Sequence, residues 1–348
     1  MYIAQKSFTV TAEDGRFEAP LFDGSRTVFT SLRLDNGGMD GTFTRVASQT
    51  QMSLLREHMD TDMLILQRSP VAVYLNGEYW GQYWLTETFD PLVICQHEGI
   101  SLAYAPKIEM TNSLRDIQIG AIQYRHDGMV TQYVFDSLTW AGPEVIRAYV
   151  NTYFDVDSML DWYAAEVFFG DMEGPDYAFY RLPDGRWKAA IMHFDSGLFY
   201  AAYNSPQSYL NGLFSEIHGG KIFALLMSIP EYRDAFLTTL GALWQKLPTM
   251  EMRWALDESE RMIIDEMPYH FMRWAPEHSR QLGDWPQESY AAMAYWQKRI
   301  SRMSNLTMVA RPFYVYYYTQ HVFGLTDEEM LHYFGSPMPP EPYGFEGR

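Results

Sequence analysis

The sequence predicts an α+β protein whose first third is mainly β-structure and whose remainder is mainly helical. Residues 70–74 and 79–87 are rich in aromatic and β-branched side chains and flank Asn76-Gly77, a pair typical of type I′ hairpin turns. Residues 155–170 begin with an Asp/Ser cap signal, carry apolar side chains at helical spacing and end on a glycine. From residue 213 onward most of the chain has helical spacing, interrupted by prolines.

The composition is that of a protein with a large core. Of 348 residues, 47% are hydrophobic, and the 25 Tyr, 21 Phe and 10 Trp supply much apolar surface to bury. Net charge is −18, which argues against a nucleic-acid partner because phosphate binding needs a basic surface. It also disfavours anionic membrane surfaces.

The sequence shows no segment that predicts a membrane span and no signal peptide. No window approaches ~18 uninterrupted apolar residues, and the first residues lack an apolar core. We therefore expect the chain as given to be soluble, while its compartment stays open. Cys95 is the single cysteine, so the chain has no internal disulfide and no cysteine-based metal site, and we expect Cys95 in the core.

The remaining elements of the first half follow from shorter signals. Short strands are expected over 2–10 and 26–34, followed by the turn Asn36-Gly37-Gly38. We also predict a helix over 46–58, a short helix or turn over 63–67, a further strand over 101–110 and an irregular hairpin over 120–134.

The second half is predicted as helices around one hairpin. A helix over 142–151 precedes the 155–170 helix, and strands 177–181 and 186–194 pair across the turn Leu182-Pro183-Asp184-Gly185. Further helices are expected over 221–228, 230–246, 249–267 and 287–309, with a linker over 276–287.

Three carboxylates are the first candidates for chemistry. Asp171 and Asp176 lie in the loop before the hairpin, and Asp195 follows its second strand. The hairpin geometry brings these groups together, and converging carboxylates repel one another unless a cation, a proton or a basic group separates them. Oxygen ligands alone favour Mg²⁺ or Ca²⁺ over zinc. Glu173, between the two loop carboxylates, is a weaker candidate.

The spacing of these carboxylates matches a known pattern. Asp171 and Asp176 are five residues apart, as are the Asp and Asn of a protein-kinase catalytic loop, and Asp195-Ser196-Gly197 stands where a kinase has Asp-Phe-Gly. Four stretches, in order, resemble the spore-coat CotH-type kinase family: 31–45 (SLRLDNGGMDGTFTR), 69–90 (SPVAVYLNGEYWGQYWLTETFD), 170–199 (GDMEGPDYAFYRLPDGRWKAAIMHFDSGLF) and 311–325 (RPFYVYYYTQHVFGL). The most specific of them is YLNGEYWGQYWLTE.

This resemblance implies a two-lobed, atypical protein-kinase-like fold. It implies a β-rich N-terminal lobe over 1–110, a mainly helical C-terminal lobe over 111–335 and a tail over 336–348. It also implies transfer of phosphoryl from ATP, with Mg²⁺, to a Ser or Thr hydroxyl of a protein substrate. Relatives are often secreted or associated with the spore coat.

The resemblance assigns roles to individual residues. Asp171 would be the catalytic base, and Asp195 would bind Mg²⁺ together with Asp176. The phosphates would be held by Lys107, Arg33 or Arg45. Glu87 would either hold such a cation or be an ordinary solvated strand end. Residues 201–212 would either gate the substrate, as a kinase activation segment does, or form a plain surface loop.

Four positions depart from the family pattern. Asp35 stands where the family has Arg, Val46 where it has Asp, Asp176 where it has Asn and His193 where relatives have an acidic residue. The first two departures would be explained if the missing Arg and Asp normally pair. An alternative function is therefore a catalytically inactive, kinase-like binding or assembly module. A third is a glycoside hydrolase that uses Asp171 and Asp195 with aromatic sugar platforms.

Overall fold

The computed structural model describes residues 4–22, 24, 26–112, 138, 140–170, 178–183, 185–195, 197–198, 210, 213–214 and 220–342. The predicted hairpin over 120–134, the acidic loop with Asp171, Glu173 and Asp176, and nearly all of 201–212 lie outside the described residues.

The first sheet carries the predicted hairpin. Its four strands are antiparallel and run in the order β1 (Phe8–Thr11), β4 (Ser31–Asp35), β7 (Glu78–Glu87) and β6 (Arg68–Leu75). Between β6 and β7, Asn76 and Gly77 both have positive φ angles, 52° and 84°, as a type I′ turn requires. The hairpin prediction is confirmed. A separate two-stranded sheet pairs β2 (Phe17–Glu18) with β3 (Val28–Phe29).

The second sheet is built around the predicted 177–194 hairpin. Its order is β5 (Leu64–Ile65), β10 (Trp187–Ile191), β9 (Ala178–Arg181) and β8 (Glu109–Thr111), with β5 parallel to β10 and the other pairs antiparallel. The sheet therefore joins strands that lie far apart in the sequence.

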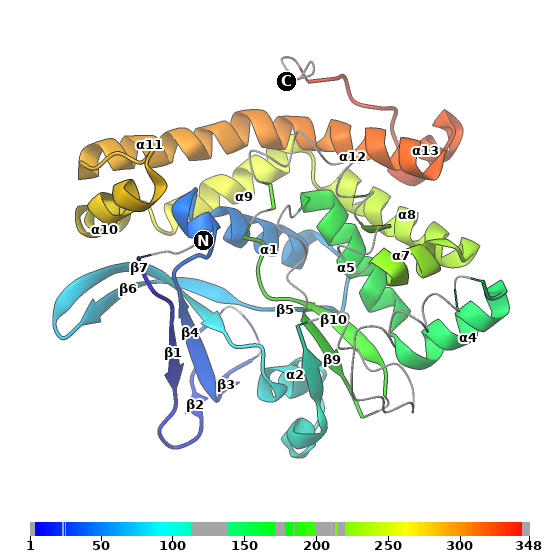
Figure 1. The fold of residues 1–348 in the computed structure, drawn as a ribbon, viewed down its shortest axis with the longest axis horizontal. Coiled ribbons are helices and arrows are strands. Elements are labelled where there is room, and N and C mark those ends of the chain that lie inside the picture. The colour runs from blue at the N-terminus through cyan, green and yellow to red at the C-terminus, as the bar shows by residue number, and fades with distance from the viewer. Residues whose placement is uncertain are drawn as a thin grey trace.

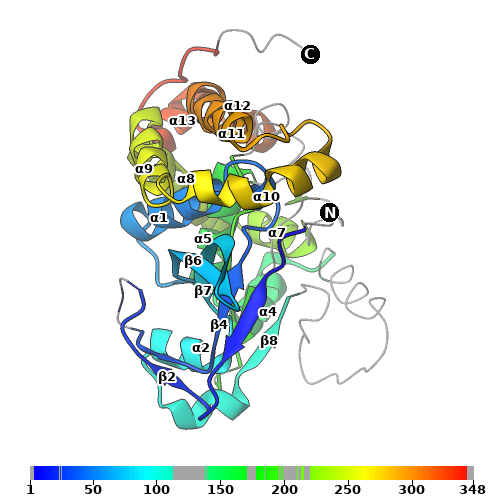
Figure 2. The same ribbon diagram turned by 90° about the vertical axis from the view of Figure 1, so that its left-hand side faces the viewer.

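Helices form the rest of the described chain. Helix α1 (Ala47–His58) lies at the centre of the molecule, with both sheets below it and the C-terminal helices α9 and α11 above it (Figure 1). In the view from the side, α10 and α1 stack over the first sheet (Figure 2). The other helices are α2 (Pro91–His97), α4 (Pro143–Tyr153), α5 (Val156–Phe169), α7 (Gly220–Met227), α8 (Pro230–Lys246), α9 (Thr249–Arg261), α10 (Met267–Leu282), α11 (Ser289–Arg302), α12 (Met308–Phe323) and α13 (Asp327–Phe334), with two short 3₁₀-helices, η1 (Asp40–Thr42) and η2 (Leu102–Lys107), and a π-helix, η5 (Met303–Thr307).

Helix α5 is the best-predicted helix. The Asp155 side chain caps it by accepting a hydrogen bond from the Ser158 N–H, and Gly170 ends it in the left-handed conformation with φ 67°. Eleven of its fourteen residues are buried, including Trp162 and Tyr163. This helix packs against β10 of the second sheet, and Cys95 of α2 is buried in the same core, as expected.

The α+β class is confirmed, but three local predictions are wrong. Residues 63–67 contain strand β5, because pairing with β10 outweighs the local signal. Most of 101–110 is the 3₁₀-helix η2, which the Ser101 side chain caps, and only its end joins β8. Helix α10 continues through Pro276 into the expected linker. The carbonyl that loses its partner there belongs to Met272, whose side chain is 69% exposed, so water can replace the lost bond.

No helix in the described part of the chain is long and apolar enough to cross a membrane.

Candidate functional site

Asp195 lies just past the end of β10, where it meets the turn that follows β4. Its carboxylate packs directly on Gly38, and a Cβ atom built on this glycine would lie only 1.6 Å from Asp195 Oδ2. Gly38 also has a φ of 56°, a conformation that other residues seldom adopt. The Asn36-Gly37-Gly38 turn therefore needs a glycine at position 38 to bring the two sheets together at Asp195.

Helix α1 holds the backbone on both sides of Asp195. The Gln51 side-chain amide donates to the carbonyls of Phe194, at 3.2 Å, and Gly197, at 3.0 Å. The Ser48 hydroxyl accepts a hydrogen bond from the Phe194 N–H at 3.0 Å. Gln51 and Ser48 are buried, so their geometry is fixed by packing. The position of Asp195 is thus tied to a helix that both sheets support.

One oxygen of the Asp195 carboxylate has no hydrogen-bond donor among the described residues. Its side chain is 18% exposed, yet Oδ1 is buried and accepts no hydrogen bond from any described residue. The nearest cationic candidate is His193, whose Nδ1 lies 3.4 Å from that oxygen. A buried carboxylate oxygen without a donor is costly unless a cation or proton meets it. This oxygen suits a hard cation such as Mg²⁺.

A second charged pair lies beside this carboxylate. Arg68 Nη2 is 3.4 Å from Asp35 Oδ2, and Arg33 Nη2 is 3.3 Å from Asp35 Oδ1. Burial alone would raise the pKa of Asp35, but Arg68, Arg33 and His193 together hold it below its ordinary value. Arg68 also donates to the Ser48 hydroxyl at 2.8 Å, so this ion pair is linked to the backbone beside Asp195.

The pairing of Asp35 bears on the family's missing Arg and Asp. Asp35 is paired in register with Trp84, whose indole N–H donates to the carbonyl of Arg45, the residue before Val46. Positions 35 and 46 are therefore both connected to Trp84. In this chain Val46 is fully buried and Asp35 is neutralised by Arg68, which lies over the Trp84 ring at 4.8 Å.

Asp40 is a further carboxylate near Asp195. It is 2% exposed and accepts hydrogen bonds from the Thr44 hydroxyl, at 2.5 Å, the Thr44 N–H and the Ser48 N–H. Burial is the main cause that raises the pKa of Asp40 to about 6, and the negative charge of Asp195 raises it further. The electrostatic environment of Asp195 is thus partly acidic.

Asp171 and Asp176 lie outside the described residues, but both ends of their segment are placed. The Phe169 carbonyl accepts a hydrogen bond from the Leu198 N–H at 2.9 Å, and Ala178 pairs with Ala190 in β10. Residues 171–177 thus connect two points that are both held by the strand and turn around Asp195.

Arg311 of α12 secures the nearer of these two points. It is fully buried and donates from Nε and Nη2 to the carbonyls of Phe168 and Val167 at the end of α5. Its guanidinium also packs on Gly170, where a Cβ atom would lie 2.6 Å from Nη2. A cation at a helix C-terminus is favoured by the helix dipole. Arg311 therefore positions the residue directly before Asp171.

Glu87 is buried in an ion pair, whereas Arg33 is half-exposed. Glu87 is buried and holds Arg26, with Nε to Oε1 at 2.7 Å and Nη2 to Oε2 at 2.6 Å. Glu87 is therefore a buried partner of Arg26 and not a solvated strand end. Arg33 lies on β4, with its side chain 52% exposed, and contacts Asp35.

Arg45 and Lys107 lie in very different surroundings. Arg45 is 2% exposed, and all three of its guanidinium nitrogens donate to protein oxygens, among them those of Gln82 and Gln5. Burial lowers the pKa of Arg45 to about 10. Lys107 is exposed, 5.4 Å from the ring of Tyr104. It precedes β8, which is level with the start of β10, so Lys107 lies toward the end of the second sheet opposite Asp195.

Ser48, Gln51, Arg68 and Arg311 were missed by the sequence reasoning. Gln51 and Arg311 form hydrogen bonds with residues more than 140 positions away, so no local sequence pattern predicts these contacts. Arg311 could have been suspected, because it begins a stretch that resembles the family.

Among the described residues, no three His, Cys, Asp or Glu side chains group as a metal site.

The model of the family described as CotH kinase protein matches residues 1–305, which include Asp195 and three of the four resembling stretches. The chain belongs to the CotH kinase protein family. No curated protein matches its sequence. The stretch 311–325 lies beyond the matched residues.

Proposed function

We propose that this CotH family member transfers the γ-phosphoryl group of ATP, with Mg²⁺, to a Ser or Thr hydroxyl of a protein substrate. The observation that carries the proposal is the Asp195 carboxylate, which α1 holds in place and whose buried Oδ1 accepts no hydrogen bond from the described residues. Family membership supports a kinase-like protein.

Asp195 is suited to hold the metal, with Asp176 as the proposed second ligand. A bound Mg²⁺ would supply positive charge that offsets the charge of the ATP phosphates. Asp195 would keep its carboxylate oriented toward the metal because Gln51 and Ser48 hold its neighbours and Gly38 leaves no other space. Preorganisation of this kind lowers the cost of orienting charge during the reaction.

Asp171 is the proposed catalytic base. It would accept or orient the proton of the acceptor hydroxyl, a role that demands a fixed position relative to Asp195. The Phe169–Leu198 hydrogen bond and the contact of Arg311 with the end of α5 support such a position for the start of this loop.

Of the three cations predicted to hold phosphate, Arg33 is the best placed. It lies on β4 two residues before Asp35 and has an exposed side chain, whereas Arg45 is enclosed by protein oxygens and Lys107 lies toward the other end of the second sheet. Arg33 is therefore the cation we propose to pair with ATP.

The test is thermal unfolding with ATP, with and without Mg²⁺, on the wild type, on Asp195→Ala and on Asp265→Ala. Asp265 is an exposed carboxylate in the turn before α10 and serves as the matched control. A ligand at 100 times its Kd stabilises by about 2.7 kcal/mol. We expect a Mg²⁺-dependent shift in the wild type and the control that disappears in Asp195→Ala, followed by ³²P transfer from γ-labelled ATP to a Ser-containing protein.

A binding or assembly module without catalysis is the second candidate. It is favoured by the Asp35–Arg68 pair, because it puts a buried carboxylate where the family has a cation. No Mg²⁺-dependent shift in any of the three proteins would reject the kinase and leave this module. A shift without phosphoryl transfer to any acceptor, including the chain itself, would leave a nucleotide-binding module.

A further inference from the structure

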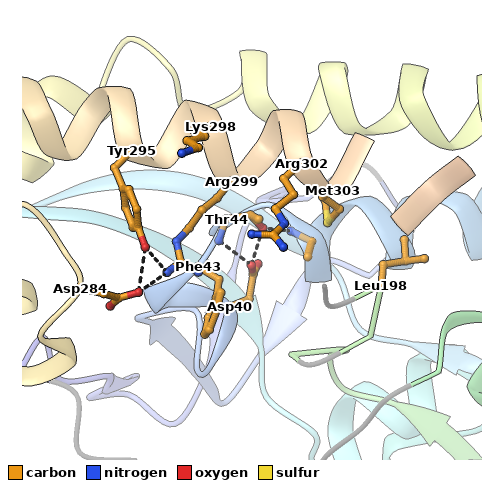
Figure 3. Close-up of a pocket in the computed structure, with 11 residues that line it drawn as sticks. Asp40, Phe43, Thr44, Leu198, Asp284, Tyr295, Lys298, Arg299, Arg302 and Met303 are labelled. Atoms are coloured by element: carbon orange, nitrogen blue, oxygen red, sulfur yellow. Dashed lines mark hydrogen bonds and ion pairs between the residues drawn. The ribbon is translucent and has the colours of Figure 1, made fainter. Parts of the chain in front are cut away.

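A cavity of about 300 Å³ lies beside the Asp195 site and is not used by the proposed chemistry (Figure 3). Its wall comes from the segment that leads into α1, from the start of α1, from Leu198, from Asp284 before α11 and from α11 with the residue that follows it. Leu198 is three residues past Asp195, and Asp40 is two residues past Gly38, the residue that the Asp195 carboxylate touches. The cavity therefore adjoins the candidate site through two of its own segments.

The α11 wall is basic in a chain of net charge −18. Lys298, Arg299 and Arg302 all line the cavity, and Lys298 and Arg302 are exposed and four residues apart, which puts them on one helix face. Figure 3 shows these three side chains extending from α11. The lining therefore brings three cations together on a short stretch of one helix.

The two carboxylates in the lining are already engaged within the wall. Asp284 accepts hydrogen bonds from Arg299, at 2.9 Å, and from the Tyr295 hydroxyl, at 2.8 Å. Asp40 accepts hydrogen bonds from Thr44 and the Ser48 N–H, as described above. Asp284 is thus paired with Arg299, and Asp40 has hydrogen-bond donors of its own, so the three cations of the lining outnumber its two carboxylates and the net charge of the lining favours an anion.

The rest of the wall is apolar and well fixed. Phe43, Leu198 and Met303 contribute apolar surface, and the guanidinium of Arg299 lies 4.5 Å over the Phe43 ring. Met303 begins the π-helix η5, a widened turn of a kind that occurs frequently at functional sites. A cavity with apolar walls and cations on one side fits a short aliphatic stem that ends in a negative group.

The place of the cavity indicates which molecule supplies that group. Leu198, which lines the cavity, is three residues past Asp195. The metal and ATP phosphates are proposed on Asp195 itself. A further anionic group bound in the adjoining cavity would therefore come from the acceptor polypeptide.

We propose that the cavity binds an anionic side chain of the acceptor polypeptide, close in sequence to the hydroxyl that is phosphorylated. The group is a carboxylate or a phosphate already attached to a neighbouring Ser, and Lys298 and Arg302 bind it with charge-assisted hydrogen bonds. This inference rests on the proposed function, since it names the acceptor class of that same site: acidic or previously phosphorylated segments.

The experiment measures fluorescence anisotropy of labelled twelve-residue peptides with the full chain in the absence of nucleotide. Each peptide has a central Ser flanked on both sides by Glu, by phosphoserine, by Gln or by Lys. The variant is Lys298→Gln/Arg302→Gln, and its matched control is Lys246→Gln/Arg261→Gln, which removes the same charge from exposed positions on α8 and α9. Thermal unfolding verifies that both variants fold.

We expect the Glu or the phosphoserine peptide to bind more tightly than the Gln and Lys peptides. The Lys298→Gln/Arg302→Gln variant should lose about tenfold or more in affinity for it, because the charge-assisted hydrogen bonds to the anion are lost. The control should bind like the wild type. Comparison of the Glu and phosphoserine peptides then separates a carboxylate site from a phosphate site.

Equal affinity for the Gln peptide, preference for the Lys peptide, or equal losses in the variant and its control would overturn the inference. The outcome is separable from that of the proposed function. Peptide preference without a Mg²⁺-ATP response would reject the kinase and keep the anion site, while the reverse would keep the kinase and reject the site.

Discussion

The two ends of strand β10 differ in whether their buried charged groups have partners. Near its start, Lys188 is 8% exposed and donates to both oxygens of Glu98, at 2.9 and 3.2 Å, and to Asp62 at 3.3 Å. Burial alone would lower the pKa of Lys188, but Glu98 and Asp62 raise it above its ordinary value. Tyr180 on β9 donates to Glu98 as well. Lys188 and Glu98 thus each have a partner of opposite charge.

Past the other end of β10, Asp195 lacks such compensation. Its buried Oδ1 accepts no hydrogen bond among the described residues, its carboxylate is pressed onto Gly38, and its charge adds to the burial that raises the pKa of Asp40 to about 6. One strand thus carries a closed ion pair near its start and, just past its end, an open carboxylate at which we propose that a cation binds.

The largest effect is expected at the closed end. Lys188→Met removes the cation and leaves Glu98, whose side chain is 13% exposed, without its partner. Breaking a buried ion pair from one side costs about 3–5 kcal/mol. Chemical denaturation should show a loss of that size, while the Mg²⁺-dependent shift with ATP persists. Loss of the ATP response in a folded Lys188→Met protein would contradict the division between the two ends.

The next effect is expected at the open end. Asp195→Ala should unfold at nearly the wild-type temperature without ligand, but should lose the stabilisation of about 2.7 kcal/mol that Mg²⁺-ATP at 100 times its Kd supplies. Calorimetric titration of ATP in Mg²⁺ measures the same loss directly. An unchanged Kd in Asp195→Ala would remove Asp195 from the metal site.

A smaller effect tests the contact between the two sheets. Gly38→Ala places a Cβ atom 1.6 Å from Asp195 Oδ2 and forces alanine into a φ of 56°. We expect a loss of about 1–3 kcal/mol together with a weaker Mg²⁺-ATP response. Gly77→Ala is the control, since its φ is also positive, at 84°, and nothing lies within 4 Å of its added Cβ. Equal behaviour of the two variants would show that Gly38 matters through strain alone.

The smallest effect is a pH dependence. The folded pKa of Asp40, about 6, lies above its ordinary value of 3.8, so its contribution to stability is present at low pH and is lost as pH rises through about 6. Asp195→Asn removes the charge that adds to this loss. The difference in unfolding free energy between Asp195→Asn and the wild type should therefore favour the variant more at pH 7.5 than at pH 4, by up to about 1 kcal/mol. A relative stability that does not change between these pH values, from denaturation at both, would contradict the coupling.

The sequence predicted local structure well where local signals decide it. The Asn76-Gly77 turn, the capped helix α5 and the β9–β10 hairpin each depend on residues close together in the chain, and all three are present. Helix α10 was misjudged because proline is a strong local signal, and the exposed position of Met272 makes Pro276 tolerable in a way that no local pattern reveals.

The candidate site was predicted in its carboxylates but not in the residues that hold them. Asp195 could be named from its spacing, whereas Gln51, Ser48 and Arg311 act through contacts between distant segments. The surroundings of the predicted cations could not be predicted from the sequence either. Arg45 and Arg33 look alike in sequence, yet one is enclosed by protein oxygens and the other has an exposed side chain.

The claim that β10 has a closed ion pair near its start and an open carboxylate past its end is tested most directly by one set of unfolding free energies at pH 7.5. Wild type, Lys188→Met and Asp195→Asn would be measured without ligand and with Mg²⁺-ATP. We predict that Lys188→Met is less stable but keeps its ligand response, and that Asp195→Asn is as stable as the wild type or more so but has lost the response. An Asp195→Asn protein that is destabilised without ligand and still responds to Mg²⁺-ATP would contradict the account.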